Sequence, residues 1–220
     1  MKLIKLNATV TASNDRDADA LRAKLKEKGT LLINLMSSAG SGKTTLLSRV
    51  IRDLPELKIG VMEADIESEV DAQRIEALGA KAVQVHTSGM CHMDAGMTAA
   101  AVEAIGAEDM DLLFLENVGN LICPAEYDTG AGKKLMILSV PEGDDKPLKY
   151  PLMFSESDAL AVTKIDALPY FDFDMDKCIE RVKKLNPAIE IFPVSAKTGE
   201  GMEALEGWIM KALNKWRAQE

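Results

Sequence analysis

The stretch Leu31-Leu-Ile-Asn-Leu-Met36, followed directly by Ser37-Ser-Ala-Gly-Ser-Gly-Lys-Thr44, decides the fold. It predicts a buried strand that breaks into a glycine-containing loop and then opens a helix at Lys43-Thr-Thr-Leu-Leu47. The backbone N–H groups of such a loop, together with the helix N-terminus, can surround a polyphosphate. This context is that of a P-loop, although Ser37 stands where the pattern G-x-x-x-x-G-K-[ST] has its first glycine. We therefore predict a site for a nucleoside triphosphate.

The loop supplies most of the predicted phosphate contacts. Lys43 is expected to reach the β and γ phosphates, and the Thr44 hydroxyl is expected to ligate Mg²⁺. The predicted nucleotide-binding residues of this segment are Ser38, Ala39, Gly40, Ser41, Gly42, Lys43, Thr44 and Thr45. We see no arginine beside the loop in an obvious position to act on the transferring phosphate, so we predict slow hydrolysis.

Composition and charge restrict the class of protein. The chain has 220 residues, of which 47% are hydrophobic and 28% charged, as in an ordinary globular domain. A net charge of −9 argues against nucleic acid as a partner. No apolar stretch approaches the roughly 20 residues that span a bilayer, and Met1-Lys-Leu-Ile-Lys-Leu6 lacks the apolar core of a secretory signal. Three cysteines are too few for a disulfide framework, so a reducing, cytoplasmic location is expected.

Strand-like and helix-like segments alternate along the chain. A polar helical stretch at 14–28 precedes the first strand, and residues 1–29 are expected to form an N-terminal extension of one P-loop domain that spans 1–220. The predicted strands are 31–36, 59–62, 82–85, 112–115, 135–138, 159–162 and 189–192, and the predicted helices include 70–78, 95–105, 175–185 and 202–216. Short apolar strands between helices predict an α/β fold, in which helices cover both faces of a mostly parallel sheet. Ligands of such sheets bind at the carboxyl ends of the strands.

Two short segments predict which base is bound. Val162-Thr-Lys-Ile-Asp166 and Pro193-Val-Ser-Ala-Lys197 resemble the guanine-recognition signatures N-K-x-D and S-A-K of GTPases. A carboxylate at Asp166 would accept hydrogen bonds from guanine N1–H and the N2 amine, which adenine does not offer. The predicted base-binding residues are Lys164, Asp166, Ser195, Ala196 and Lys197. Because Thr163 replaces the usual asparagine, we expect the brace between the base and the P-loop to be missing and the affinity for guanine to be weakened.

Acidic residues at strand ends complete the predicted catalytic set. Asp65 follows the second strand and Glu116 follows the fourth, where a carboxylate facing a P-loop can hold Mg²⁺ or orient the attacking water. The predicted catalytic residues are thus Lys43, Asp65 and Glu116, and the predicted Mg²⁺ ligands are Thr44, Asp65 and Glu116. Glu63 and Asp71 are lower-ranked alternatives.

A second group of residues has the chemistry of a soft-metal site. Cys91-His92 is expected to begin a helical segment, where the helix N-terminus would lower the thiol pKa, and Cys123 lies in the loop after Glu116. Because these loops follow two strands of one sheet, we expect the three side chains to meet. Two thiols and an imidazole suit Zn²⁺, Ni²⁺ or copper, and the fourth position stays open or is filled by a second subunit. Cys178 falls on an apolar helical stripe and is expected in the core.

Taken together, these segments resemble a known family. The P-loop, Cys91-His-Met-Asp94 and Glu116-Asn-Val-Gly-Asn-Leu-Ile-Cys-Pro124 are similar to those of the hydrogenase-maturation nickel-chaperone GTPases, the HypB family. Glu142-Gly-Asp-Asp145 and the segment 163–166 fit as well, and the resemblance extends from about residue 30 to the C-terminus. Related urease-maturation GTPases carry a Cys-Pro-His metal motif instead.

The resemblance implies a GTPase that delivers nickel to the large subunit of [NiFe]-hydrogenase. It also implies a GTP-dependent homodimer with metal at the subunit interface and a small metallochaperone partner. Residues 1–30 contain neither Cys nor His, so a nickel-storage stretch is not expected there. Two alternatives remain open from the residues: another metal-delivery GTPase of the urease type, and a small-molecule kinase in which Cys91, His92 and Cys123 are structural.

Overall fold

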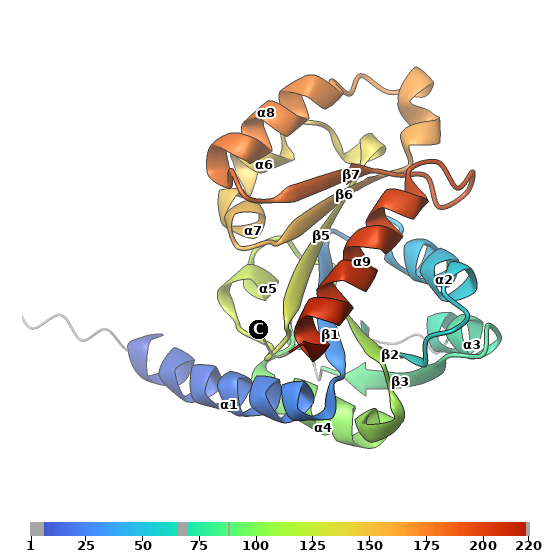
Figure 1. Ribbon diagram of the computed structural model, residues 1–220. Helices are drawn as coiled ribbons and strands as arrows, with labels where there is room; N and C mark the ends of the chain where they lie inside the picture. The colour runs from blue at the N-terminus through green and yellow to red at the C-terminus, as the bar shows by residue number, and fades with distance from the viewer. Residues whose placement is uncertain (1–6, 66–69, 88, 219–220) are drawn as a thin grey trace, which may run out of the picture.

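Seven parallel strands form the centre of the molecule (Figure 1). The computed structural model describes residues 7–65, 70–87 and 89–218, with side chains described from residue 12 onward except at 65 and 70–72. Within that part of the chain the strand order is β3-β2-β4-β1-β5-β6-β7, and each neighbouring pair is parallel. The strands are β1 (Leu31–Ser37), β2 (Ile59–Asp65), β3 (Lys81–His86), β4 (Leu112–Glu116), β5 (Lys133–Ser139), β6 (Ala159–Thr163) and β7 (Glu190–Pro193).

Helices cover both faces of the sheet. The α-helices are α1 (Asn7–Lys28), α2 (Lys43–Asp53), α3 (Val70–Glu76), α4 (Ala95–Ile105), α5 (Cys123–Glu126), α6 (Lys146–Lys149), α7 (Pro151–Ser155), α8 (Met175–Leu185) and α9 (Met202–Arg217). Short 3₁₀ helices are η1 (Ala107–Asp109), η2 (Val140–Glu142) and η3 (Ile165–Tyr170). Helices α2, α3 and α9 contribute to the hydrophobic core on one face, whereas α1, α4, α7 and α8 contribute to the cores on the other.

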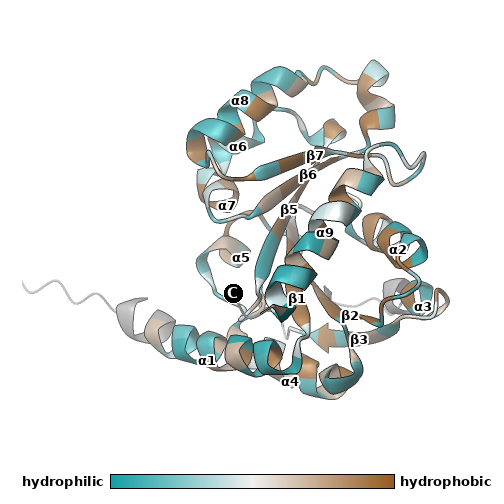
Figure 2. Cartoon of the chain, viewed as in Figure 1, coloured by the Kyte–Doolittle hydropathy of each residue, from teal (hydrophilic) through white to brown (hydrophobic). Residues whose placement is uncertain are grey.

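The alternation of side chains along β1 explains these two layers. Leu31, Ile33 and Leu35 join the core beneath α2 and α9, whereas Leu32 and Met36 point into the cores on the opposite face. The whole strand is buried because both of its faces are covered. Figure 2 shows the result, with hydrophobic residues gathered on the central strands and hydrophilic ones on the outward sides of the helices.

The structure confirms the predicted fold class. Each predicted strand corresponds to an observed one, although β2 runs on to Asp65 and β7 is displaced by one residue, to Glu190–Pro193. Helix α3 ends at Glu76, two residues before the predicted end. Among the described residues, no helix combines the length and the apolar character needed to cross a bilayer.

Candidate functional site

The carboxyl end of β1 opens into a loop that leads directly to α2. Gly40 and Gly42 have φ angles of 74° and 98° in this loop, a region that residues with a Cβ rarely adopt. Of the described side chains, none caps the N-terminus of α2, so its first N–H groups are left to a ligand. A cavity of about 420 Å³ lies here, lined by Ala39, Gly40, Gly42, Lys43, Thr44, Thr45, Glu63, Ala64, Arg74, Glu116, Asn117, Gly119 and Lys164.

Ser37 holds the phosphate-binding lysine in place. Its buried hydroxyl accepts hydrogen bonds from Lys43 Nζ at 3.0 Å and from the Ser41 hydroxyl at 2.7 Å, and it donates to the Ser38 carbonyl at 2.8 Å. The serine at the position of the usual glycine is therefore part of the site. Sequence reasoning treated it only as a departure from the pattern.

Two of the predicted Mg²⁺ ligands face each other across the cavity. The Thr44 hydroxyl lies 3.1 and 3.3 Å from the two carboxylate oxygens of Glu116, which ends β4. Glu63 lies opposite Glu116 in the register of β2 and β4, is 2% exposed and also lines the cavity. A hydroxyl and carboxylates at one point form the oxygen donor set that Mg²⁺ prefers. Asp65 ends β2, but its side chain and that of Asp71 lie outside the described part of the structure.

One arginine reaches this cavity, contrary to the sequence-based expectation. Arg74, from α3, lines it beside Lys43, Thr44 and Glu116. The neighbouring residue Ile75 is fully buried and belongs to the same hydrophobic core as the apolar face of α2. Helix α3 therefore packs beside α2. Because α3 lies about 30 residues beyond the P-loop in the chain, only the packing of the two helices brings this guanidinium to the phosphate end.

The predicted base-binding residues lie together on the loops after β6 and β7. Asp166 accepts a hydrogen bond from the Ser195 hydroxyl at 2.7 Å, which ties the two segments to each other. Ala196 lines a small cavity that also contacts Thr44 and Thr45, and Lys197 is exposed on the same loop. Lys164 has a left-handed backbone, with φ 60° and ψ 38°, and its Nζ donates to the Gly40 carbonyl at 2.8 Å.

Thr163 corrects the expectation that the brace to the P-loop is missing. Its hydroxyl donates a hydrogen bond to the Ser41 carbonyl at 2.7 Å, and both residues are buried. A threonine thus retains a link between β6 and the P-loop. The Ser38 hydroxyl forms a further link, because it hydrogen-bonds the carboxylate of Glu142 in η2.

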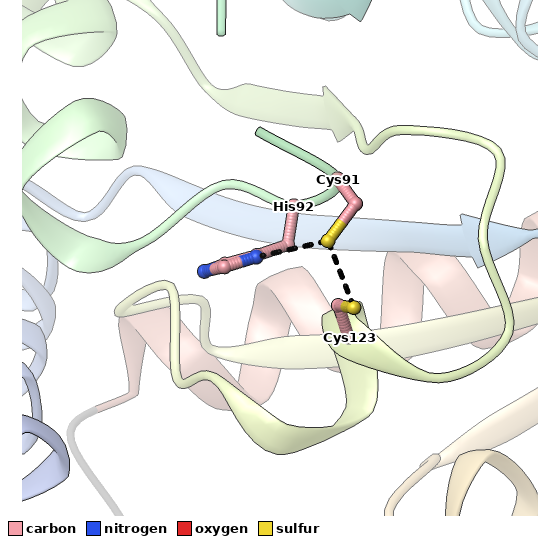
Figure 3. A group of neighbouring side chains, drawn as sticks. All are labelled: Cys91, His92 and Cys123. Atoms are coloured by element: carbon pink, nitrogen blue, oxygen red, sulfur yellow. Dashed lines mark hydrogen bonds between the residues drawn. The ribbon is translucent and has the colours of Figure 1, made fainter. Parts of the chain in front are cut away.

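Cys91, His92 and Cys123 lie together, with their ligand atoms close to one another (Figure 3). Their ligand atoms lie within 4.8 Å of one another, with Cys91 Sγ 2.9 Å from Cys123 Sγ and 3.7 Å from His92 Nδ1. The two sulfurs are too far apart for a disulfide, and both thiols are free. The His92 ring is stacked on Tyr127, with ring centroids 3.8 Å apart and planes at 20°. Cys178 is buried in the core, as expected.

The environment of these side chains differs from the one that the sequence predicted. Cys91 and His92 precede α4, which begins at Ala95 behind its N-cap Asp94, so they do not begin a helix. Burial lowers the pKa of His92, which keeps the imidazole neutral and a ring nitrogen available. The hydrogen bond with Cys91, together with burial, raises the pKa of Cys123. This thiol therefore holds its proton until a cation displaces it.

The segment 116–123 connects the cavity to the cluster. Asn117 follows Glu116, is 1% exposed and lines the cavity. Its Oδ1 accepts from the backbone N–H of Met93 at 3.2 Å and of Val118 at 2.9 Å, and its Nδ2 donates to Asn34 Oδ1 at 3.1 Å. Met93 directly follows His92. Residues 116–123 therefore carry a carboxylate of the cavity, a hydrogen bond to the backbone that follows His92, and the Cys123 thiol.

Close packing holds this segment against the P-loop. A Cβ on Gly119 would lie 2.8 Å from the Ala39 backbone nitrogen, so only glycine fits without a shift. Near its other end, Asn120 Nδ2 donates to the Cys91 carbonyl at 3.4 Å, and its Oδ1 accepts from the Ile122 N–H at 2.9 Å. Sequence reasoning missed Arg74, Asn117, Asn120 and Tyr127. The asparagines could have been found from their places in the Glu-Asn-Val-Gly-Asn segment, but Arg74 and Tyr127 gave no local signal.

The fold and the cavity define a P-loop nucleotide-binding protein, and comparison with known proteins identifies the family. Residues 31–193 match the family model described as CobW/HypB/UreG, nucleotide-binding domain. The hydrogenase maturation factor HypB of Rhizobium leguminosarum bv. viciae is 44% identical over 94% of this chain and 70% of its own length. The chain therefore belongs to the HypB family of hydrogenase maturation factors.

Solved structures agree with this assignment. The crystal structure of the hydrogenase maturation factor HypB from Archaeoglobus fulgidus matches with a TM-score of 0.87 and 37% identity, over 92% of this chain and 99% of that one. HypB from Helicobacter pylori, solved in complex with nickel, matches with a TM-score of 0.87 and 38% identity, over 94% and 96% of the two chains.

Proposed function

We propose that this protein is a Mg²⁺-dependent GTPase that inserts nickel during the maturation of [NiFe]-hydrogenase. The observation that supports the proposal is the arrangement of two sites: the cavity at the P-loop and the group of Cys91, His92 and Cys123 are joined by residues 116–123. An enzyme that only hydrolyses a nucleotide has no need of the second site. The nickel complex of the H. pylori relative supports nickel as the cargo.

Hydrolysis is assigned to the residues around the cavity. Lys43 neutralises charge on the γ-phosphate, and the N–H groups of the loop and of α2 bind the remaining oxygens. Thr44 and Glu116, with Asp65 as a third candidate, would hold Mg²⁺, which neutralises charge on the β and γ phosphates when bound. Glu63 lines the same cavity and is the alternative carboxylate ligand.

Selection for guanine is assigned to Asp166. Its carboxylate, oriented by the Ser195 hydroxyl at 2.7 Å, would accept from guanine N1–H and from the N2 amine. The stem of Lys164 would cover one face of the base while its Nζ stays on the Gly40 carbonyl. The Ala196 N–H would donate to guanine O6, and Lys197 lies on the same loop.

The nucleotide is proposed to control the metal. GTP orders the loops that follow β2 and β4, and two subunits associate so that Cys91, His92 and Cys123 hold the ion at their interface. After hydrolysis, GDP loosens this interface and the ion passes between a small nickel metallochaperone, this protein and the hydrogenase large subunit in the cytoplasm. Zn²⁺ suits the same ligands and is the competing ion.

The hydrolytic half of the proposal is tested with Lys43→Ala. GTP turnover is measured as phosphate release with and without Mg²⁺, using Lys184→Ala as the control, because Lys184 is exposed on α8 and pairs with Glu180 far along the chain from the cavity. We expect turnover to require Mg²⁺, to persist in the control and to be lost in Lys43→Ala. Unchanged turnover in Lys43→Ala would refute the assignment of the P-loop.

A further inference from the structure

We propose that Arg74 is a catalytic residue for GTP hydrolysis, supplied by the chain that binds the nucleotide. This inference rests on the proposed GTPase activity and adds a group to it. The step it serves forms a bond between the oxygen of water and the γ-phosphorus and breaks the bond to the β–γ bridging oxygen. The bridging oxygen leaves on GDP with its electron pair, and the water proton ends on inorganic phosphate.

The first argument is the position of Arg74. It lines the phosphate cavity with Lys43, Thr44 and Glu116, and it also lines the adjoining cavity over Thr44 and Thr45. Arg74 therefore lies beside both cavities at the N-terminus of α2, where the γ-phosphate is expected. The fully buried neighbour Ile75 fixes this part of α3 against the core.

The second argument comes from the other cations of the cavity. Lys43 Nζ is held by Ser37 at the base of the P-loop, and Lys164 Nζ is held by the Gly40 carbonyl on the side of the base. Of the arginines in the described part of the chain, Arg74 is the one that lines this cavity. Arg22, Arg181 and Arg217 form ion pairs with aspartates elsewhere. Arg49 and Arg52 line the adjoining cavity but not this one, and Arg49 pairs with Asp53.

The third argument is chemical. Charge builds on the γ-phosphate and on the leaving oxygen during the step, and a planar guanidinium can bind two phosphate oxygens at once. The carboxylates of Glu63 and Glu116 line the same cavity, so their negative charge offsets the charge of the guanidinium there. A guanidinium placed at the γ-phosphate would stabilise the charge that develops in the transition state. An arginine in this role accelerates hydrolysis by about 10³-fold or more.

The test compares Arg74→Ala and Arg74→Lys with Arg16→Ala. Arg16 is an exposed arginine of α1 and lines neither the phosphate cavity nor the adjoining one. We expect kcat to fall by at least about 100-fold in Arg74→Ala and to be only partly retained in Arg74→Lys, which keeps the charge but cannot bind two phosphate oxygens at once. GDP affinity should change by less than about 3-fold, because GDP lacks the γ-phosphate. Arg16→Ala should match the wild type.

Two further measurements separate catalysis from a structural role. Guanidinium ion added at millimolar concentration should restore part of the turnover of Arg74→Ala, and this variant should lose binding of GDP–aluminium fluoride while it keeps binding of GDP. A wild-type kcat in Arg74→Ala would overturn the inference and leave the proposed GTPase intact. Equal losses of kcat and GDP affinity, without rescue, would show a structural residue and also overturn it. A wild-type protein that does not hydrolyse GTP would overturn both.

Discussion

Replacement of Asn117 by alanine tests how the two sites are connected. The side chain is 1% exposed and forms three hydrogen bonds, two accepted from backbone N–H groups and one donated to Asn34. Alanine leaves the N–H of the buried residue Met93 and the Oδ1 of Asn34 without partners. Each of these two unpaired buried groups costs about 1–3 kcal/mol, so we expect the free energy of unfolding to fall by about 2–6 kcal/mol.

The assay is urea unfolding of the metal-free protein, followed by titration of Ni²⁺ into each folded variant. Asn34→Ala is the matched control, because it also breaks the bond between the two asparagines but leaves the bond to the Met93 N–H. Both variants should be destabilised, but only Asn117→Ala should bind Ni²⁺ more weakly, by about 10-fold, since it frees the peptide that follows His92. A loss of stability below about 0.5 kcal/mol, or equal Ni²⁺ affinity in the two variants, would refute the reasoning.

Two further predictions concern the base and the thiols. Asp166→Asn should lose GTP binding and gain partial binding of xanthosine triphosphate, because xanthine presents a carbonyl where guanine presents an amine. Competition assays measure this change. A native protein that binds ATP as well as GTP would contradict the assignment of Asp166. Burial raises the pKa of Cys178 to about 12. A thiol reagent at pH 8 should therefore label Cys91 and Cys123 in the native protein and Cys178 only in urea, as detected by mass spectrometry. Labelling of all three cysteines in the native protein would show that Cys178 is accessible and contradict the prediction.

The sequence predicted the strands and the two sites because their signals are local. An apolar run before Ser37 and a glycine loop after it define β1 and the P-loop without reference to the rest of the chain. The approach of Cys91 to Cys123 followed from a topological rule, since the loops after parallel strands meet at one edge of the sheet. Each of these features could be inferred from adjacent residues or from the order of strands and helices along the chain.

The features that escaped prediction depend on packing between segments far apart in the chain. Arg74 reaches the cavity because Ile75 is buried beside α2, and the stacking of Tyr127 on His92 follows from the course of one loop. The helices α5, α6 and α7 have four or five residues, too few for a hydrophobic period to be visible. Cys91 and His92 lie only a few residues before α4, which begins at Ala95, and a sequence pattern does not fix a helix boundary to that precision.

If the nucleotide controls the metal, the affinity for Ni²⁺ must differ between the GDP and GTP states. Ni²⁺ is titrated into the protein with GDP and with a non-hydrolysable GTP analogue, while light scattering reports the mass. We predict tighter binding by about 10-fold or more in the GTP state, together with dimers, and a reciprocal gain in affinity for the analogue when Ni²⁺ is bound. Cys91→Ala and Cys123→Ala should lose the metal and keep the nucleotide. Equal Ni²⁺ affinity in the two states would contradict the claim and leave a GTPase with an unrelated metal site.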